Sequence, residues 1–304
     1  MKKIFRIPAV SAYWLLSLVL CFSFIATSSF TLEAGEIPLP QGLFSKAEVM
    51  KSERDGMWEK SLVVHFPEKR RVLSTTDGWV DALAVVNHAA QPQLWFSMCQ
   101  VLKTEHEVGG KVYLRNIRER IARQLGISPD AIAQTGTAAD MDNLAVVTKV
   151  FKPFTVTVLV TAGAETNALR TGVDEGAYVE GGEDPKGTVN ILVLTDARLT
   201  DGAMARAIIT ATEAKTAAFQ DLRVPSSYTK GVQATGTGTD SIIVVSGKTG
   251  PVVTQTGGHS KIGELIGKAV YEAVLVALEK QNGFTLPAKG ADSRQACKQA
   301  KAGK

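Results

Sequence analysis

Four polar clusters in the sequence carry side chains of the types used in catalysis. Three follow apolar runs directly: one contains Asn167, the next Asp196, and the third Ser246. The fourth, ATGTGTD at residues 234–240, stands immediately before the apolar run SIIVVSG. Ligands of α/β proteins tend to bind outside the carboxyl ends of strands, where loops leave a crevice. We therefore expect the three strand-end clusters to share one site, with Asn167 and Asp196 among the ligand-binding residues.

The ATGTGTD segment alternates threonine with glycine and ends in an aspartate. Its glycines allow backbone N–H groups to turn toward a ligand, while its other side chains supply hydroxyls and a carboxylate. That composition suits the binding of an oxyanion or a polar amide. The segment lacks the Lys-Ser/Thr ending of a P-loop, which argues against a nucleotide site. The candidate binding residues in it are Thr235, Thr237, Thr239 and Asp240.

One histidine stands out among the four in the chain. His259 follows two glycines and comes just before a predicted helix, in TQTGGHSKIGELIG. A histidine at a glycine-flanked helix start is accessible and can exchange protons near neutral pH. His259 is therefore the first candidate for proton transfer.

Apolar runs and helical spacing predict the elements that position these residues. Near-continuous β-branched content in the last three predicted strands indicates burial on both faces. The first predicted helix ends in glycine, the second opens with Thr200 and Asp201 as alternative N-caps, and the third ends at Asn282 and Gly283. The predicted strands are 61–66, 154–163, 187–196 and 241–247, and the predicted helices are 111–126, 200–222 and 260–283.

The alternation of strands with helices predicts an α/β fold. We expect a single domain with a largely buried sheet and flanking helices, whose strand order the sequence leaves open. Its predicted limits are residues 35–285. The stretch 286–304, rich in alanine, lysine and glycine, is expected to form a disordered basic tail.

The first 34 residues have the order of a secretory signal peptide. Lys2, Lys3 and Arg6 precede an apolar stretch at 12–26, and small residues follow. We expect export, to the periplasm, with cleavage after Ser28 or Ala34. An uncleaved membrane anchor is the alternative for residues 1–34, and it is the one route by which we expect a membrane contact.

The charge distribution argues against nucleic-acid binding. The formal net charge is +4, and eight basic residues lie in the N-terminal segment and the tail. The near-neutral body between them offers no continuous positive face for a phosphate backbone.

Several long stretches occur in a fixed order along the chain. They are GTAADMDNL (136–144), VTAGAETNALRTG (160–172), residues 187–222, ATGTGTDSIIVVSG (234–247) and GGHSKIGELIGKAVYEAV (257–274). In combination they closely resemble the adenosylcobinamide amidohydrolase family, CbiZ, and the resemblance spans roughly residues 70–282. One departure is Trp79, which stands where that family has a second glycine. Asp140 lies in one of the matching stretches and joins the candidate substrate-binding residues.

The resemblance implies a role in corrinoid salvage. Such enzymes hydrolyse the amide between the aminopropanol arm and the corrin ring of adenosylcobinamide, giving adenosylcobyric acid. This chemistry needs an activated water or nucleophile, stabilisation of an oxyanion and a proton for the leaving amine. We expect His259 to act as general base and then acid, Asp240 to orient or activate a partner, and the ATGTGTD donors to bind the oxyanion. Glu213, close to Lys215, is a second candidate for proton transfer.

Other mechanisms and one other function stay open at this point. A threonine of ATGTGT could act as nucleophile, or His259 with Asp196 or Asp240 could hold a metal-bound water, although one histidine is few for zinc. No cofactor is assigned with certainty, a divalent metal ion is an open alternative, and the corrinoid is the expected small-molecule partner. The sequence leaves the oligomeric state open. An exported corrinoid-binding protein without hydrolysis is the alternative function.

Overall fold

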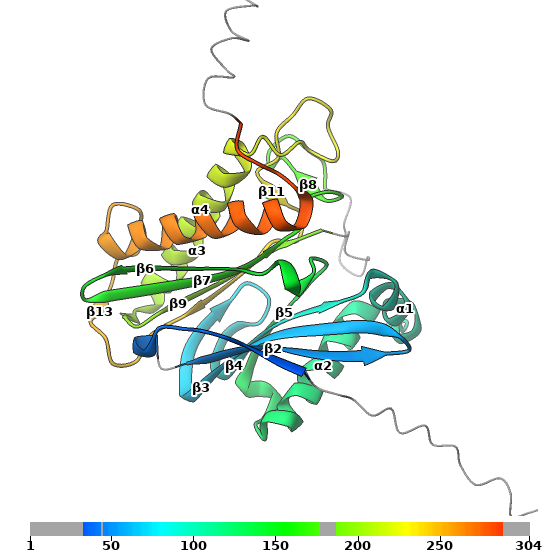
Figure 1. Cartoon of the computed structure of the whole chain (residues 1–304), viewed down its shortest axis with the longest axis horizontal. Helices are drawn as coiled ribbons and strands as arrows, with labels where there is room; N and C mark the ends of the chain where they lie inside the picture. Colours follow the sequence, from blue (N-terminus) through cyan, green and yellow to red (C-terminus); the bar gives the residue numbers. More distant parts are fainter. Residues whose placement is uncertain (1–32, 44, 177–186, 288–304) are drawn as a thin grey trace, which may run out of the picture. The chain divides into compact units, whose positions relative to one another are not determined.

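The fold is built around a sheet that turns over on itself, as the computed structural model in Figure 1 shows. The structure describes residues 33–43, 45–176 and 187–287. Residues 1–32 of the predicted signal peptide and 288–304 of the predicted tail lie outside these ranges.

In the described ranges, nine strands form this main sheet. β3 pairs with β4 along one edge, while its other edge pairs first with β2 and then with β12. The register of β3 against β4 shifts between His65 and Arg70, and such irregularities bend a strand. The strands are β1 (Glu33–Ile37), β2 (Lys46–Arg54), β3 (Met57–Ser74), β4 (Gly78–Ala90), β5 (Ile132–Thr137), β6 (Ala145–Phe151), β7 (Phe154–Ala162), β9 (Val189–Thr195) and β12 (Ser241–Val245).

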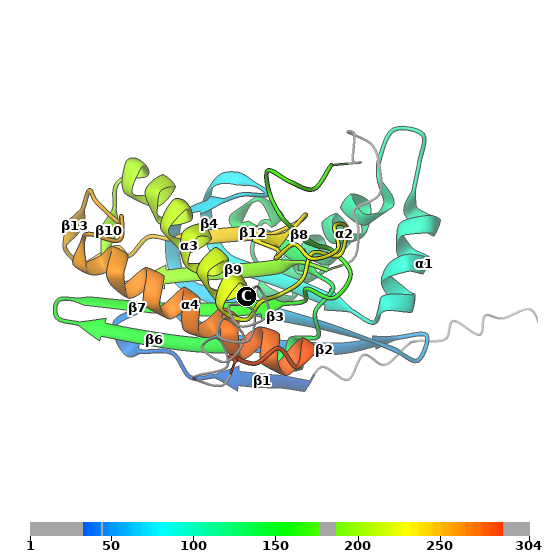
Figure 2. The same ribbon diagram turned by 90° about the horizontal axis from the view of Figure 1, so that it is seen from above.

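Helices cover both outer faces of the folded sheet, giving four layers. α1 (Pro92–Leu102) and α2 (Gly109–Leu125) pack outside β3, β4 and β5, while α3 (Asp201–Asp221) and α4 (Lys261–Asn282) pack outside β7, β9 and β12 (Figure 2). A middle apolar cluster joins the two halves of the sheet, with Leu62 and Val85 on one side and Leu159 and Leu192 on the other. Within the described residues, the structure contains no helix with the length and apolarity of a membrane span.

The predicted α/β class and single domain are confirmed, and the predicted elements correspond to β3, β7, β9, β12, α2, α3 and α4. β7, β9 and β12 are buried on both faces because each lies between a helix layer and the other half of the sheet. The helix caps follow local chemistry. Thr200 Oγ1 accepts from the Ala203 N–H at 3.3 Å, so Thr200 is the N-cap of α3. Gly126 and Gly283 end α2 and α4 in the left-handed conformation.

A buried polar chain lies between β3, β4 and α2. His88 Nδ1 and Ser61 Oγ are 2.8 Å apart, and His88 Nε2 lies 3.2 Å from the Tyr113 hydroxyl. Tyr113 donates to the Glu59 carboxylate at 2.6 Å, which also pairs with Arg120 at 2.7 Å. Burial would raise the pKa of Glu59, but Arg120 and the Tyr113 hydroxyl hold it below its usual value. Complete burial lowers the pKa of His88 to about 3.

This burial predicts an acid-sensitive fold. Between about pH 6.5 and 3 the unfolded chain binds a proton at His88 that the folded chain does not bind. The free energy of unfolding is therefore highest above this pH range and decreases as the pH drops through it. In denaturant titrations, the slope from this group is at most about 1.4 kcal/mol per pH unit. We expect His88→Gln to flatten the profile, and His106→Gln, at an exposed position, to leave it unchanged. An unaltered slope in His88→Gln would contradict this account.

Candidate active site

The ATGTGTD segment folds around its own aspartate. The Asp240 carboxylate accepts hydrogen bonds from the Thr237 N–H at 3.1 Å, the Thr237 hydroxyl at 2.5 Å and the Val189 N–H at 3.1 Å. Lys215 of α3 pairs with the other side of the carboxylate. Both charged side chains are mostly buried, with 9% of Lys215 and 14% of Asp240 exposed. Asp240 thus joins α3, the start of β9 and its own loop.

The glycines of the segment are explained by close approach of these side chains. A Cβ atom at Gly236 would overlap both the Lys215 ammonium and the Asp240 carboxylate, and one at Gly238 would lie 3.0 Å from Asn167 Oδ1. Glycine removes these clashes because it has no Cβ. The glycines therefore admit protein side chains, where the sequence had suggested a bound ligand.

The threonine donors of the segment also point to protein acceptors. The hydroxyl of Thr235 donates to Leu169 O at 3.3 Å and that of Thr239 to Gly187 O at 2.9 Å. Backbone N–H groups of the segment bond to the chain at 167–169, with which Gly236–Thr237 (β11) pairs through Ala168–Leu169 (β8). These predicted oxyanion donors do not face a ligand, because Asp240, Gly187 and the chain at 167–169 accept their hydrogen bonds.

The predicted residue Asn167 links this segment to a cavity. Its Nδ2 donates to Gly187 O at 2.9 Å and lies 3.3 Å from Thr239 Oγ1, and its Oδ1 accepts from the Tyr228 hydroxyl at 2.7 Å. Gly187 lines the cavity. Asn167 and Thr239 therefore position the cavity wall at Gly187 through their hydrogen bonds.

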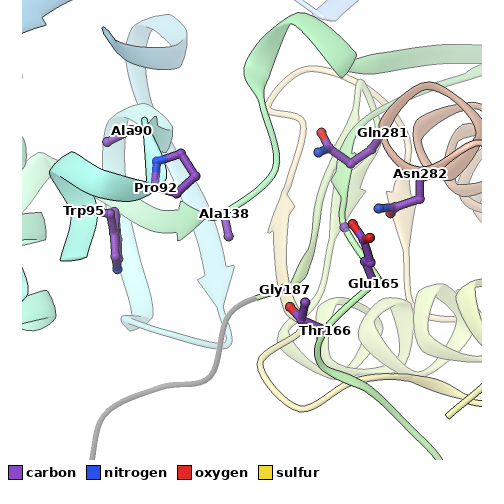
Figure 3. Close-up of a pocket in the computed structure, with 10 residues that line it drawn as sticks. Ala90, Pro92, Trp95, Ala138, Glu165, Thr166, Gly187, Gln281 and Asn282 are labelled. Carbon is purple, nitrogen blue, oxygen red and sulfur yellow. The ribbon is translucent and has the colours of Figure 1, made fainter. Parts of the chain in front are cut away.

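The cavity has a volume of about 210 Å³ and two chemically different sides. Figure 3 shows Ala90, Pro92 and Trp95 on one side, with Glu165, Gln281 and Asn282 opposite. Trp95 packs edge-on against Tyr113, with ring centroids 5.3 Å apart. The wall is completed by Ala138, Gly163, Thr166 and Gly187. An apolar pocket with a few convergent polar groups is the usual form of a small-molecule site.

Hydrogen bonds fix the orientation of both cavity carboxamides. Gln281 Oε1 accepts from the Asp140 N–H at 3.0 Å and from Asn143 Nδ2 at 2.8 Å. Asn282 Oδ1 accepts from the Ala164 N–H at 3.0 Å. Because a backbone N–H can only donate, these contacts assign the oxygens, and the amide nitrogens remain for a ligand. The polar side of the cavity therefore combines two N–H donor groups with the Glu165 carboxylate, and Glu165 is the ionisable side chain among the described lining residues.

Buried amides and hydroxyls join the two halves of the sheet beside the cavity. Asn87 of β4 donates to Thr161 of β7 at 2.9 Å, and Asn190 of β9 donates to Asn87 at 2.9 Å. Asn190 also donates to Gly136 O at 2.7 Å. Satisfied buried networks of this kind fix a unique arrangement. The ends of β4, β5 and β7 that form the cavity are therefore held at a set separation.

The strand-end clusters do not share one site, contrary to expectation. β7 runs antiparallel to β9, so its carboxyl end lies beside the start of β9, near Gly187. β12 runs parallel to β9, which places Ser246 and Asp196 together at the opposite end of these strands. The seven residues of β9, about 20 Å long, separate that end of the strands from the end beside the cavity. Asp196 Oδ1 accepts from the Thr155 N–H at 2.8 Å, a contact that fixes the start of β7.

The predicted proton-transfer residues also lie apart from Asp240 and from the cavity. His259 is exposed before the start of α4, while Gln281 lies at its other end, about 30 Å away along the helix. Glu213 lies on the exposed face of α3, whereas Lys215 is buried. His259, Asp196 and Asp240 do not converge, and in the described residues no group of three or more His, Cys, Asp or Glu side chains could hold a metal ion.

This placement changes the result expected for His259. We expect His259→Ala to keep kcat and KM for adenosylcobinamide within about threefold of the native values, because the imidazole is far from the cavity. Steady-state kinetics on the purified chain would measure this. A loss of a hundredfold or more, the size expected for a general base, would return His259 to the mechanism.

Comparison with known proteins identifies the family. The model of the family described as adenosylcobinamide amidohydrolase (CbiZ) matches residues 43–286. The chain belongs to the adenosylcobinamide amidohydrolase family. It is 45% identical over 245 residues to a Methanocaldococcus jannaschii protein described as uncharacterized protein MJ1613, covering 76% of this chain and 91% of that one. It is 34% identical over 102 residues to the adenosylcobinamide amidohydrolase of Methanosarcina mazei, covering 31% of this chain and 47% of that one.

A distant match among the solved structures has low sequence identity to this chain. The crystal structure of the PH0078 protein from Pyrococcus horikoshii OT3 aligns with a TM-score of 0.38 and 12% identity, covering 87% of this chain and 90% of that one. A likeness at this level carries no inference about the site.

In this member of the amidohydrolase family, the sequence patterns gave little indication of the cavity residues. Asn282 fitted a helix C-cap, and Gln281 was an unremarkable residue in the last turn of a predicted helix. Glu165 stood in the strand-end cluster with Asn167 but had no distinguishing partner in sequence. Trp95 lies on α1, which the apolar spacing did not predict. The signal available was the cluster at 161–170 itself, which does border the cavity.

Proposed function

We propose that this protein hydrolyses the amide between the aminopropanol arm and the corrin ring of adenosylcobinamide, giving adenosylcobyric acid. Family membership supports this reaction class. The observation that carries the proposal is the set of two oriented carboxamide donors and one carboxylate around a single cavity. Amide hydrolysis needs donors for the oxyanion and a base that can later act as an acid.

The cavity size favours a substrate that enters by one arm. A volume of about 210 Å³ is smaller than the roughly 300–1,000 Å³ typical of pockets that enclose a whole drug-sized ligand. A corrin ring is larger than such ligands, so in this proposal it stays at the mouth. The arm and its amide enter between Trp95 and the polar side, which brings the scissile bond to Glu165, Gln281 and Asn282.

In the proposed reaction, Glu165 takes a proton from water as the water oxygen attacks the amide carbon. The carbonyl oxygen gains negative charge and accepts hydrogen bonds from the side-chain N–H groups of Gln281 and Asn282. The protonated Glu165 then gives its proton to the amine nitrogen as the C–N bond breaks. One water is consumed, and the products are a carboxylic acid and the free aminopropanol.

The purified full-length chain tests this proposal directly. We expect incubation with adenosylcobinamide to release aminopropanol and adenosylcobyric acid, both measured by mass spectrometry. Tight binding with no release over many hours would contradict hydrolysis and support the alternative of a corrinoid-binding protein. The same assay with a chelator tests the alternative of a metal-bound water. That mechanism predicts that the chelator abolishes activity and that an added divalent ion restores it.

A further inference from the structure

A short turn, distant from Gln281 in the sequence, determines which end of the Gln281 carboxamide carries the oxygen. This turn, η3 (Met141–Asn143), follows β5 and is preceded by its N-cap, Asp140. Both hydrogen bonds to Gln281 Oε1 come from it, one from the Asp140 backbone and one from the Asn143 side chain. The turn thus presents two donors and no acceptor to the carboxamide.

The turn is held firmly by a buried lysine. Lys60 of β3 donates to Asp140 Oδ1 and to Asp142 Oδ2, each at 2.6 Å, and its ammonium lies 4.6 Å from the Trp58 ring. Asp140 Oδ1 also accepts from the Asp142 N–H at 3.0 Å. Lys60 is only 8% exposed. This explains the predicted residue Asp140, whose carboxylate binds Lys60 and its own turn.

A carboxamide can occupy the same space in two orientations that exchange oxygen and nitrogen. Two donors at one end select the orientation with oxygen toward them. The nitrogen then serves the cavity, where an amide carbonyl or an oxyanion needs a donor. The reversed orientation would place oxygen beside the developing negative charge, which is repulsive.

We propose that Asn143 is a positioning residue that sets the polarity of the cavity by holding Gln281 with its N–H group toward the substrate carbonyl. This inference rests on the proposed hydrolysis. Asn143 acts through Gln281, and its side-chain nitrogen is the donor that a substitution can change, since the Asp140 donor belongs to the backbone.

The test inverts the polarity at this position without changing its size. Asn143→Asp replaces a donor with an acceptor, which repels Gln281 Oε1 and attracts Nε2. We expect kcat to fall roughly tenfold to a hundredfold with little change in KM, because the lost donor acts mainly on the transition state. Asn143→Ala removes one donor and leaves the Asp140 N–H, so it should cost less than about fivefold. An Asn143→Ala effect equal to or larger than that of Asn143→Asp would overturn the proposal.

A double-mutant cycle shows whether the effect passes through Gln281. In a Gln281→Ala background, Asn143→Asp should change kcat by less than twofold, since no carboxamide remains to be reversed. An undiminished effect there would mean that Asn143 acts by another route. If the native chain releases no aminopropanol, hydrolysis itself fails, and the same cycle is measured on the Kd of adenosylcobinamide by equilibrium dialysis. Weaker binding in Asn143→Asp that vanishes with Gln281→Ala would still support the positioning role, and unchanged binding would refute it.

Discussion

Glu165→Gln is expected to lower kcat for adenosylcobinamide hydrolysis by roughly a hundredfold to ten-thousandfold, the range typical of a lost general base. Glutamine keeps the size of the side chain but cannot take a proton from water. KM should change little, because the corrin ring and the apolar wall at Trp95 supply most of the contact. Single-turnover measurements of aminopropanol release would separate the chemical step from product release.

Glu213→Gln provides the matched control for this change. Both glutamates are exposed, but Glu213 lies on the outer face of α3 and Glu165 lines the cavity. We expect the Glu213 variant to keep native turnover. Loss of activity in Glu213→Gln with full activity in Glu165→Gln would place the reaction outside the cavity.

Asp240→Asn is expected to lower the free energy of unfolding by about 3–5 kcal/mol, because it leaves the mostly buried Lys215 ammonium without its carboxylate. For a domain of this size the melting temperature should fall by roughly 10 °C. At temperatures well below the new midpoint, kcat should stay within severalfold of native, since Asp240 bonds to the protein and not to the cavity. Thermal unfolding and steady-state kinetics on the same preparation would test both statements.

Two further variants test whether the expected loss of stability comes from leaving a buried charge unpaired. Lys215→Met combined with Asp240→Asn removes both charges, so it should recover part of the lost stability. Glu68→Gln breaks an exposed pair with Lys248 and should cost at most about 1 kcal/mol. If Asp240→Asn instead abolished turnover with an unchanged melting temperature, the carboxylate would be acting on substrate, as its sequence context first suggested.

Local sequence patterns determined much of this fold. The strands at β7, β9 and β12 and the helices α2, α3 and α4 follow from apolar spacing over a few residues, and Thr200 and Gly283 mark helix ends through contacts within one turn. The family resemblance has the same origin, because the matching stretches are continuous in sequence. Five strands of the main sheet (β1, β2, β4, β5 and β6) and the helix α1 were not predicted. The alanine-rich sequence of β4 has no clear strand period, and its burial comes from neighbours distant in the chain.

The location of the site was decided only by the tertiary structure. The antiparallel pairing of β7 with β9 places the polar cluster at 161–170 beside the cavity and Asp196 at the other end of β9. The sequence predicts Asp240 as a catalytic carboxylate, but in the structure it pairs with Lys215, which lies on a helix 25 residues earlier. Gln281 became a cavity donor because a turn 138 residues away supplies Asn143. Hydrogen-bond partners so distant in sequence leave no local pattern. The roles of these side chains are therefore determined by the packing of the layers and could not be predicted from the sequence.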